Sequence, residues 1–324
     1  MQHPYDALTP DAVVDAVEQV GLRCDLRLIA LNSYENRVYQ VGIEDETPVI
    51  AKFYRPERWS DAQILEEHAF AQELVDAELS VVAPMAINGA TLHQVGGFRM
   101  AIFARRGGHA PEFDNFDNLL VLGRTLGRIH RIGSANRFKY RNHLSIDRMV
   151  TESRQFLSAH FIPRDLLPAY DSLAADLEAA VRETLADYSA TDNIRLHGDC
   201  HSGNILWRDN TAHFVDLDDC INGPAIQDLW MFLSGERHHR ELQVAELIEG
   251  YNEFGDFDPR QLRWVEALRT MRLMHHAAWL GRRWQDPAFP MAFPWFGQPR
   301  FWSDHILELR EQMSALNEPT LRLL

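Results

Sequence analysis

The sequence predicts an α+β protein with a small, strand-rich N-terminal lobe and a larger, mostly helical C-terminal lobe. Three observations support this prediction. Alternating apolar residues and tight turns dominate roughly the first hundred residues. Segments with apolar residues at helical spacing dominate the rest. Between them, the Arg-Arg-Gly-Gly segment 105–108 is typical of a hinge or loop, so we expect the lobes at residues 1–105 and 106–324.

Two helices are expected in the N-terminal lobe. Thr9 can cap the first, Pro10 suits its first turn, and valines follow at helical spacing. Ser60 can cap the second, which we place in segment 61–79. Several apolar residues of this second helix lie near one face, which is typical of a helix that packs on a core.

Strands are predicted on both sides of the second helix. Apolar residues alternate within segment 26–43, and segment 47–54 contains a short apolar run typical of a buried strand. Segment 89–104 is typical of a hairpin whose turn is the Gly96–Gly97 pair.

The C-terminal lobe is expected to be mostly helical. Segments 114–133 and 163–188 carry apolar residues at helical spacing, with Gly133 near the end of the first. A short strand is predicted within segment 212–219, and helical sequence follows it to the end.

The composition is that of an acidic globular protein. The chain has 324 residues, 46% of them hydrophobic, and a formal net charge of −15. Such a charge disfavours binding to nucleic acid or to an anionic membrane, and suits either a cationic substrate or simply a solvated acidic surface. The first ten residues do not resemble a signal peptide, and the three cysteines suit a reducing compartment. We therefore expect a cytoplasmic enzyme or binding protein.

The stretch RLHGDCHSGNILW, residues 195–207, concentrates polar groups just before an apolar triplet. His197 and His201 have the four-residue spacing of a zinc-protease helix. Two nearby glycines disfavour a helix, and Cys200 has no neighbouring cysteine, so a zinc site is disfavoured. A turn of ordinary turn-forming residues and a site for a charged substrate remain as alternatives.

Two carboxylates and an amide follow one another at spacings that suit phosphoryl transfer from a nucleotide. Asp199 and Asn204 are five residues apart, and Asp216 lies on the next predicted strand. Such transfer depends on positioning and charge neutralisation rather than on covalent catalysis. We predict Asp199 and Asp216 as catalytic residues: Asp199 orients the acceptor hydroxyl and takes its proton, while Asn204 and Asp216 supply the oxygen ligands that Mg²⁺ prefers.

The same stretch resembles the catalytic loop H-x-D-x-x-x-x-N of the protein-kinase-like superfamily, in the variant found in aminoglycoside phosphotransferases, choline kinases and homoserine kinases. Together with LNSYENRVYQV, KFYRPERW, QILEEHAFA and FVDLDD, it resembles the bacterial stress response kinase A family along nearly the whole chain. The resemblance implies a bilobal protein-kinase-like fold. It also implies ATP- and Mg²⁺-dependent phosphorylation of Ser/Thr hydroxyls in proteins, with autophosphorylation, and a role in surviving stress.

The resemblance also implies which residues hold the phosphates of ATP. Lys52, at the end of the strand VIAK, resembles the small-lobe lysine that contacts them. A carboxylate on the following helix usually holds such a lysine. Glu67 is our choice because Phe70 and Leu74 then lie on the inward face, and Glu66 is the alternative.

The loop over the phosphates departs from the protein-kinase pattern, since G-x-G-x-x-G is absent. LNSYENRVYQV occupies its place, where Ser33 and Asn36 offer polar groups to the nucleotide. The resemblance implies that Ser33 contacts ATP, whereas the residues alone are equally typical of a hairpin turn.

Adenine is expected to bind at the segment IFARR. Backbone groups between Phe103 and Arg105 would recognise adenine by hydrogen bonds. Ala51 and Leu206 are candidates for the apolar walls of the slot, although core packing is the ordinary role of such residues.

Two points remain open from the sequence. The loop residues suit a small-molecule acceptor, such as an amino alcohol, sugar or aminoglycoside, as well as a protein, and a catalytically inactive nucleotide-binding protein is a third hypothesis. Asp218 and Asp219 extend the acidic run, and we expect one of them to reach a second Mg²⁺ or both to be solvated or to cap the next segment.

Overall fold

The computed structural model describes residues 5–323, and the chain divides into two compact units. The first comprises Met1–Asn142, Ile194–Asn222 and Glu246–Asp256, and the second comprises His143–Asn193, Gly223–Ala245 and Phe257–Leu324. Residues 1–4 lie outside the described part. They begin the N-terminal segment that we expected not to be a signal peptide. The lobe boundary after residue 105 stays a prediction.

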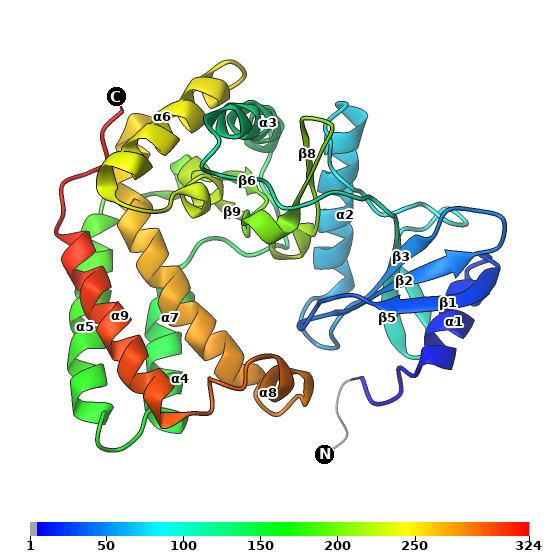
Figure 1. Cartoon of the computed structure of the whole chain (residues 1–324), viewed down its shortest axis with the longest axis horizontal. Helices are drawn as coiled ribbons and strands as arrows, with labels where there is room; N and C mark the ends of the chain where they lie inside the picture. The colour runs from blue at the N-terminus through cyan, green and yellow to red at the C-terminus, as the bar shows by residue number, and fades with distance from the viewer. Residues whose placement is uncertain (1–4, 324) are drawn as a thin grey trace. The chain divides into compact units, whose positions relative to one another are not determined.

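The first unit contains a five-stranded antiparallel sheet, with α1 (Pro10–Gln19) and α2 (Asp61–Asp76) near it (Figure 1). Its strands, in spatial order, are β1 (Cys24–Ala30), β2 (Arg37–Ile43), β3 (Val49–Phe53), β5 (Phe98–Ala104) and β4 (His93–Val95). The predicted hairpin is confirmed: Gly96 and Gly97 connect β4 to β5 with positive φ angles of 56° and 83°, which a tight two-residue turn requires.

The two expected helices of this unit are present, and both caps are confirmed. In α1 (Pro10–Gln19), the hydroxyl of Thr9 accepts a hydrogen bond from the amide of Ala12 at 3.2 Å. In α2 (Asp61–Asp76), Ser60 and Gln63 cap each other's backbone amides. Each cap satisfies amides that the first helical turn leaves without a partner.

The alternation of β3 determines which side chains reach the functional face of the sheet. Ala51 and Phe53 are fully buried in the core that α1 covers. Lys52, between them, points to the opposite face, where its partner across the ladder, Ala101, packs with Ile64 of α2. The period of two in the strand therefore places the lysine beside α2.

The backbone of the third helix, α3 (Phe116–Ser134), lies very close to that of α6 (Arg237–Asn252). A Cβ at Gly123 or Gly127 would overlap carbonyl groups of Leu247 and Tyr251 in α6. A Cβ at Gly133 would overlap the carbonyl of Arg195 in the same way. The predicted helix is confirmed, and its glycines serve close packing.

Four short strands follow α3 in the first unit. β6 (Ile194–Leu196) pairs with β9 (Ile221–Gly223), and β7 (Ile205–Arg208) forms a hairpin with β8 (Thr211–Phe214). The stretch RLHGDCHSGNILW thus runs from β6 into β7. The predicted strand of segment 212–219 is shorter than expected and ends at Phe214.

The second unit is helical. Its α-helices, besides the first part of α6, are α4 (Glu152–His160), α5 (Leu167–Thr184), α7 (Val265–Arg283), α8 (Ala288–Ala292) and α9 (Pro299–Leu316). Aromatic residues of the tail pack on one another, for instance Trp284 on Phe296 with ring centroids 4.9 Å apart. The chain also has short 3-10 helices at Ala190–Asp192, Ser202–Asn204, Leu217–Asp219, Ala225–Asp228, Trp230–Phe232 and Pro259–Trp264, and a π-helical turn at Asp147–Thr151.

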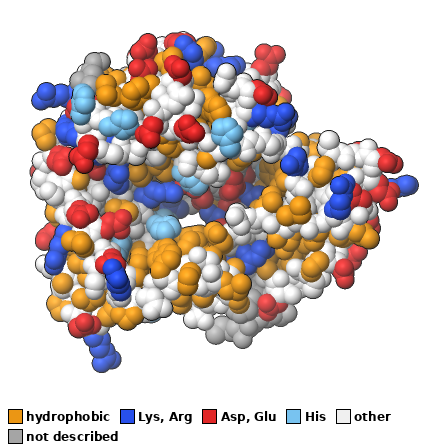
Figure 2. Space-filling view, in the orientation of Figure 1, with side chains coloured by type: hydrophobic (Ala, Val, Ile, Leu, Met, Phe, Trp, Pro, Cys, Tyr) orange, Lys and Arg blue, Asp and Glu red, His pale blue; other side chains and the backbone are white. Residues whose placement is uncertain are grey.

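Sheet and helices together confirm the predicted α+β class. Figure 2 shows acidic and basic side chains interspersed on the visible face. Among residues 5–323, no helix combines the length and the apolar character that crossing a bilayer requires.

We predict that Gly127→Ala destabilises the protein by about 1–3 kcal/mol, because the new methyl group would force α3 away from α6. Alanine is otherwise the better helix former by about 1 kcal/mol, so a loss of stability shows that packing outweighs propensity. Urea unfolding would measure the change. Gly107→Ala is the control, since a Cβ there meets nothing within 4 Å. A Gly127→Ala protein as stable as wild type would contradict the close contact.

Candidate phosphoryl-transfer site

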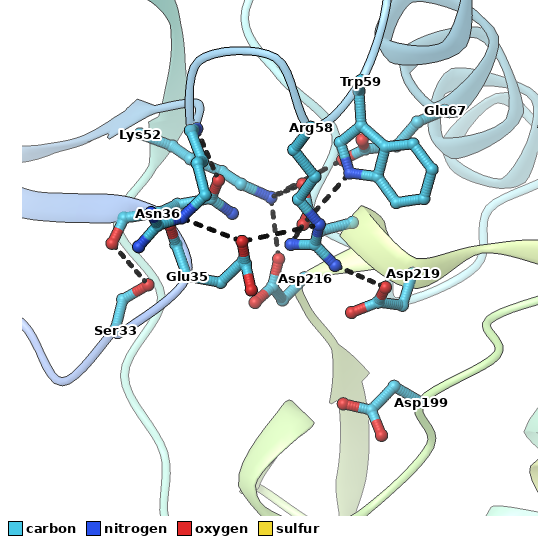
Figure 3. A network of polar contacts seen from close by, with 12 residues as sticks. Ser33, Glu35, Asn36, Lys52, Arg58, Trp59, Glu67, Asp199, Asp216 and Asp219 are labelled. Atoms are coloured by element: carbon cyan, nitrogen blue, oxygen red, sulfur yellow. Dashed lines mark hydrogen bonds and ion pairs between the residues drawn. The ribbon is translucent and has the colours of Figure 1, made fainter. Parts of the chain in front are cut away.

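Residues predicted from separate motifs meet in the first unit (Figure 3). Gly198 has a φ of +87°, and a Cβ there would overlap the carbonyl of Asp219. The buried ring of His197 donates through Nε2 to the carbonyl of Val215 at 2.9 Å. The amide of Val215 in turn donates to the carbonyl of Asn204 at 3.0 Å. The predicted catalytic loop is therefore bound to the segment that carries Asp216, and His197 has a structural role in this contact.

The side chains of the loop orient Asp199. The Asn204 amide nitrogen donates to the carbonyl of Asp199 at 2.9 Å and lies 3.5 Å from its carboxylate. His201 Nε2 lies 3.4 Å from the same carboxylate, while its Nδ1 accepts a hydrogen bond from the amide of Gly203. Because the nitrogen of Asn204 faces the loop, its amide oxygen points away from the loop and suits a hard cation.

The zinc interpretation has no structural support. Residues 202–204 form only a single 3-10 turn, so His197 and His201 do not share a helix face. Within residues 5–323, no group of three or more His, Cys, Asp or Glu side chains is arranged to hold a metal ion.

Lys52 is surrounded by three carboxylates. Its Nζ lies 2.8 Å from Asp216, 3.0 Å from Asp218 and 3.8 Å from Glu67. The side chains of Lys52, Glu67 and Asp218 are at most 5% exposed, whereas that of Asp216 is 48% exposed. Burial alone would lower the pKa of Lys52, but the three carboxylates outweigh it and hold the pKa well above the ordinary value.

Of the two candidate helix carboxylates, Glu67 is the one that faces Lys52. Burial raises the pKa of Glu67 to about 7. Glu66 points elsewhere and accepts hydrogen bonds of 2.5 to 2.8 Å from the amides of Lys139, Tyr140 and Arg141. It therefore holds the chain segment that follows α3.

Asp218 is buried, which excludes solvation among the alternatives left open for it. Its carboxylate contacts the guanidinium of Arg58, and Trp59 Nε1 lies 3.5 Å away. Arg141 donates to the backbone carbonyls of Asp218 and Cys220. Burial would raise the pKa of Asp218, but Arg58, Lys52 and Arg141 together hold it well below the usual range. The half-exposed Asp219 also binds Arg58, at 2.6 Å.

The polar groups of the predicted phosphate loop bind one another. Ser33 donates to the carbonyl of Asn36 at 3.3 Å. The Asn36 side chain is buried, and its oxygen accepts a hydrogen bond from the amide of Arg55 at 3.1 Å. Figure 3 shows both residues on the loop beside Lys52, and their contact with a nucleotide stays a prediction.

The predicted hinge runs beside β7. His109 and Trp207 exchange two backbone hydrogen bonds, of 2.7 and 3.1 Å. A Cβ at Gly108 would lie 2.9 Å from that of Leu206. The structure thus brings the hinge and Leu206 together, while the exposed side chain of Arg105 bonds Gln40 at 2.7 Å.

Ala51 was the wrong candidate for an adenine wall, since it is buried in the core on the α1 side. The residue two positions before Lys52, Ile50, shares the lysine's face and lies opposite Phe103 in the ladder. Side chains point to alternate faces along β3, and this alternation was the sequence signal that identifies Ile50.

Sequence reasoning missed three residues of the network: Arg58, Trp59 and Arg141. Both guanidinium groups lie over the Trp59 ring, with Cζ 5.0 Å and 4.1 Å from its centroid. The basic residues of KFYRPERW, set against the acidic FVDLDD, were a usable signal for Arg58. Arg141 carries no comparable local signal.

Comparison with known proteins identifies the family of this chain. Residues 26–265 match the phosphotransferase enzyme family, so the chain belongs to that family. The enzyme class expected from the loop residues is thereby confirmed.

Within this family, the chain resembles proteins named Stress response kinase A. It is 47% identical to the one from Escherichia coli O157:H7, over 98% of this chain and 97% of that protein. A Salmonella typhimurium relative named Serine/threonine protein kinase RdoA is 46% identical, with the same coverage. The resemblance to the stress response kinase A family is confirmed.

Solved structures support the kinase-like fold. An aminopropanol kinase associated with a microcompartment has a TM-score of 0.73 at 16% identity, covering 96% of this chain and 99% of that one. Amicoumacin kinase hAmiN, in complex with AMP-PNP, Ca²⁺ and Ami, has a TM-score of 0.71 at 18% identity, covering 91% of this chain and 92% of that one. At these identities the likeness concerns the fold.

We predict that Lys52→Met lowers the free energy of unfolding by about 3–5 kcal/mol at pH 8, because it leaves buried carboxylates without their cation. The pKa of Asp218, now low, then rises, and the pKa of Glu67, already raised by burial, rises further. Between pH 5 and 7 the folded state holds protons that the unfolded state has released, so stability falls as pH rises. The deficit against wild type should therefore shrink by roughly 1.4 kcal/mol per pH unit on acidification.

Thermal melts at pH 5.5 and 8 would measure this effect. Lys139→Met is the matched control, because Lys139 is exposed and is the only other lysine of the chain. A deficit of equal size at both pH values would show that the carboxylates do not depend on Lys52.

Proposed function

We propose that this phosphotransferase uses ATP and Mg²⁺. The observation that carries the proposal is the hydrogen bond from Val215 to the Asn204 carbonyl, which joins the Asn204 loop to the residue before Asp216. An amide oxygen and a half-exposed carboxylate form an oxygen donor set that fits Mg²⁺, which usually keeps water and phosphate oxygens as its other ligands. When bound, the ion neutralises charge on the transferred phosphoryl group.

Each remaining residue has a role in this proposal. Lys52 contacts the phosphates, and Glu67 and Asp218 face it. Asp199, oriented by Asn204 and His201, accepts the proton of the acceptor hydroxyl. Ser33 and the hinge from Phe103 to Arg105, with Leu206, contact the nucleotide.

We further propose that the acceptors are Ser/Thr hydroxyls of proteins, including the chain itself, and that the enzyme acts in a stress response in the cytoplasm. The support comes from relatives that match nearly the whole chain at 46–47% identity and are named Stress response kinase A and Serine/threonine protein kinase RdoA. The kinases named for small-molecule acceptors are 16–18% identical and support the fold only. A small-molecule acceptor therefore remains the second candidate.

We predict that Asp199→Asn lowers kcat by about 100- to 10,000-fold, because an amide cannot accept the hydroxyl proton. ATP affinity should change less than about threefold, since the proposed phosphate contacts come from Lys52 and the metal ligands. Single-turnover transfer and calorimetric titration with ATP would measure the two quantities. Asp209→Asn, on the exposed turn between β7 and β8, is the control. Near-normal transfer by Asp199→Asn would remove Asp199 as the base.

The acceptor class is tested by incubating the protein with γ-labelled ATP, alone, with a generic basic protein, and with a panel of amino alcohols and sugars. We expect label on the chain itself and on the basic protein, and no label with Asp199→Asn. Turnover confined to the small alcohols would favour the second candidate. ATP binding without transfer to any acceptor would support the inactive-protein hypothesis.

A further inference from the structure

Lys52 cannot keep all three carboxylates once the site is loaded. Asp216 is its nearest partner at 2.8 Å, but it is also the proposed metal ligand and is half exposed. A carboxylate that ligates a cation gives up much of its interaction with a neighbouring lysine. Asp218 and Glu67 are then the two groups left to hold Lys52 in place.

The distances to Lys52 distinguish Asp218 from Glu67. Lys52 Nζ lies 3.0 Å from Asp218, which is ion-pair distance, and 3.8 Å from Glu67. Glu67 also faces Arg141 at 3.8 Å, so it makes no close contact with either cation.

Asp218 is also fixed more firmly. Arg58 binds its carboxylate, Trp59 lies beside that carboxylate, and Arg141 binds its backbone carbonyl. The single turn Leu217–Asp219 starts from Asp216 in a left-handed conformation, with φ 59° and ψ 67°. This turn leaves the side chain of Asp216 half exposed while that of Asp218 is buried.

We infer that Asp218, clamped by Arg58 and Arg141, is the residue that positions Lys52 for the phosphates of ATP, in the place usually given to the helix glutamate. The inference rests on the proposed function and refines it. As a consequence, one short turn carries both Asp216, the proposed metal ligand, and, two residues later, Asp218, the carboxylate that holds Lys52. Arg58 extends the clamp to the predicted phosphate loop, since it also faces Glu35 at 3.9 Å.

The test compares two isosteric substitutions in the same pocket, Asp218→Asn and Glu67→Gln. We expect Asp218→Asn to weaken ATP binding at least tenfold and to lower kcat/KM at least 100-fold. Glu67→Gln should lose at least threefold less than Asp218→Asn in both quantities at pH 7. Asp219→Asn removes a carboxylate that binds Arg58 at 2.6 Å, whereas the ion pairs described above for Lys52 are with Asp216, Asp218 and Glu67. The loss in Asp219→Asn should therefore be smaller than that in Asp218→Asn.

A second readout follows Lys52 itself and needs no turnover. The chain has two lysines, Lys52 and Lys139, so the rate of modification by an amine reagent can be read at each by peptide mass spectrometry, with exposed Lys139 as internal reference. Losing its anchor should lower the pKa of Lys52, and Asp218→Asn should speed its modification at pH 8 at least tenfold relative to Lys139. Glu67→Gln should change it less than threefold.

A Glu67→Gln protein that loses as much ATP affinity as Asp218→Asn, or exposes Lys52 to the reagent as strongly, would overturn the inference. If Asp218→Asn does not fold, as judged by circular dichroism, Glu67→Gln alone decides: a loss of ATP affinity beyond tenfold overturns the inference, and one within threefold supports it. Failure of wild type to bind ATP would instead overturn the proposed function, and the lysine labelling would still identify the anchor.

Discussion

The site depends on one constraint, which is that a buried lysine must have carboxylate partners. Lys52 lies in the middle of a strand whose other face is closed by α1, so its ammonium group can be neutralised only on the α2 side. Three carboxylates meet it there, one from α2 and two from the segment after β8. A buried charge without a partner costs several kcal/mol, so this requirement joins the sheet, the helix and the loop.

Three carboxylates around one lysine are themselves an excess of charge. Arg58 and Arg141 supply the missing cations, and Trp59 between them provides an aromatic surface for both guanidinium groups. Replacing such networks by apolar residues often stabilises a protein, so the network is better understood as fixing geometry than as adding stability. The left-handed conformation of Asp216, unusual for a residue with a side chain, is held within this network.

The loop that carries Asp199 is positioned by contacts with the backbone. His197 and Asn204 bind the residue before Asp216, and the absence of a Cβ at Gly198 lets the loop approach Asp219. These contacts position Asp199 without using any of the carboxylates around Lys52. The interactions that hold Asp199, the proposed base, are thus separate from the ion pairs that hold Lys52, the proposed phosphate ligand.

Local features were determined by the sequence alone: the helix caps at Thr9 and Ser60, the Gly96–Gly97 turn, and the catalytic loop with its family resemblance. Each depends on residues a few positions apart, so spacing is sufficient. The choice of Glu67 over Glu66 as the carboxylate that faces Lys52 was also made from the sequence, because Phe70 and Leu74 mark the inward face of α2. Tertiary structure alone decided that Asp218 is buried and that Arg141 binds its backbone. These two outcomes depend on contacts between residues 77 to 160 positions apart in the chain, which no local pattern records.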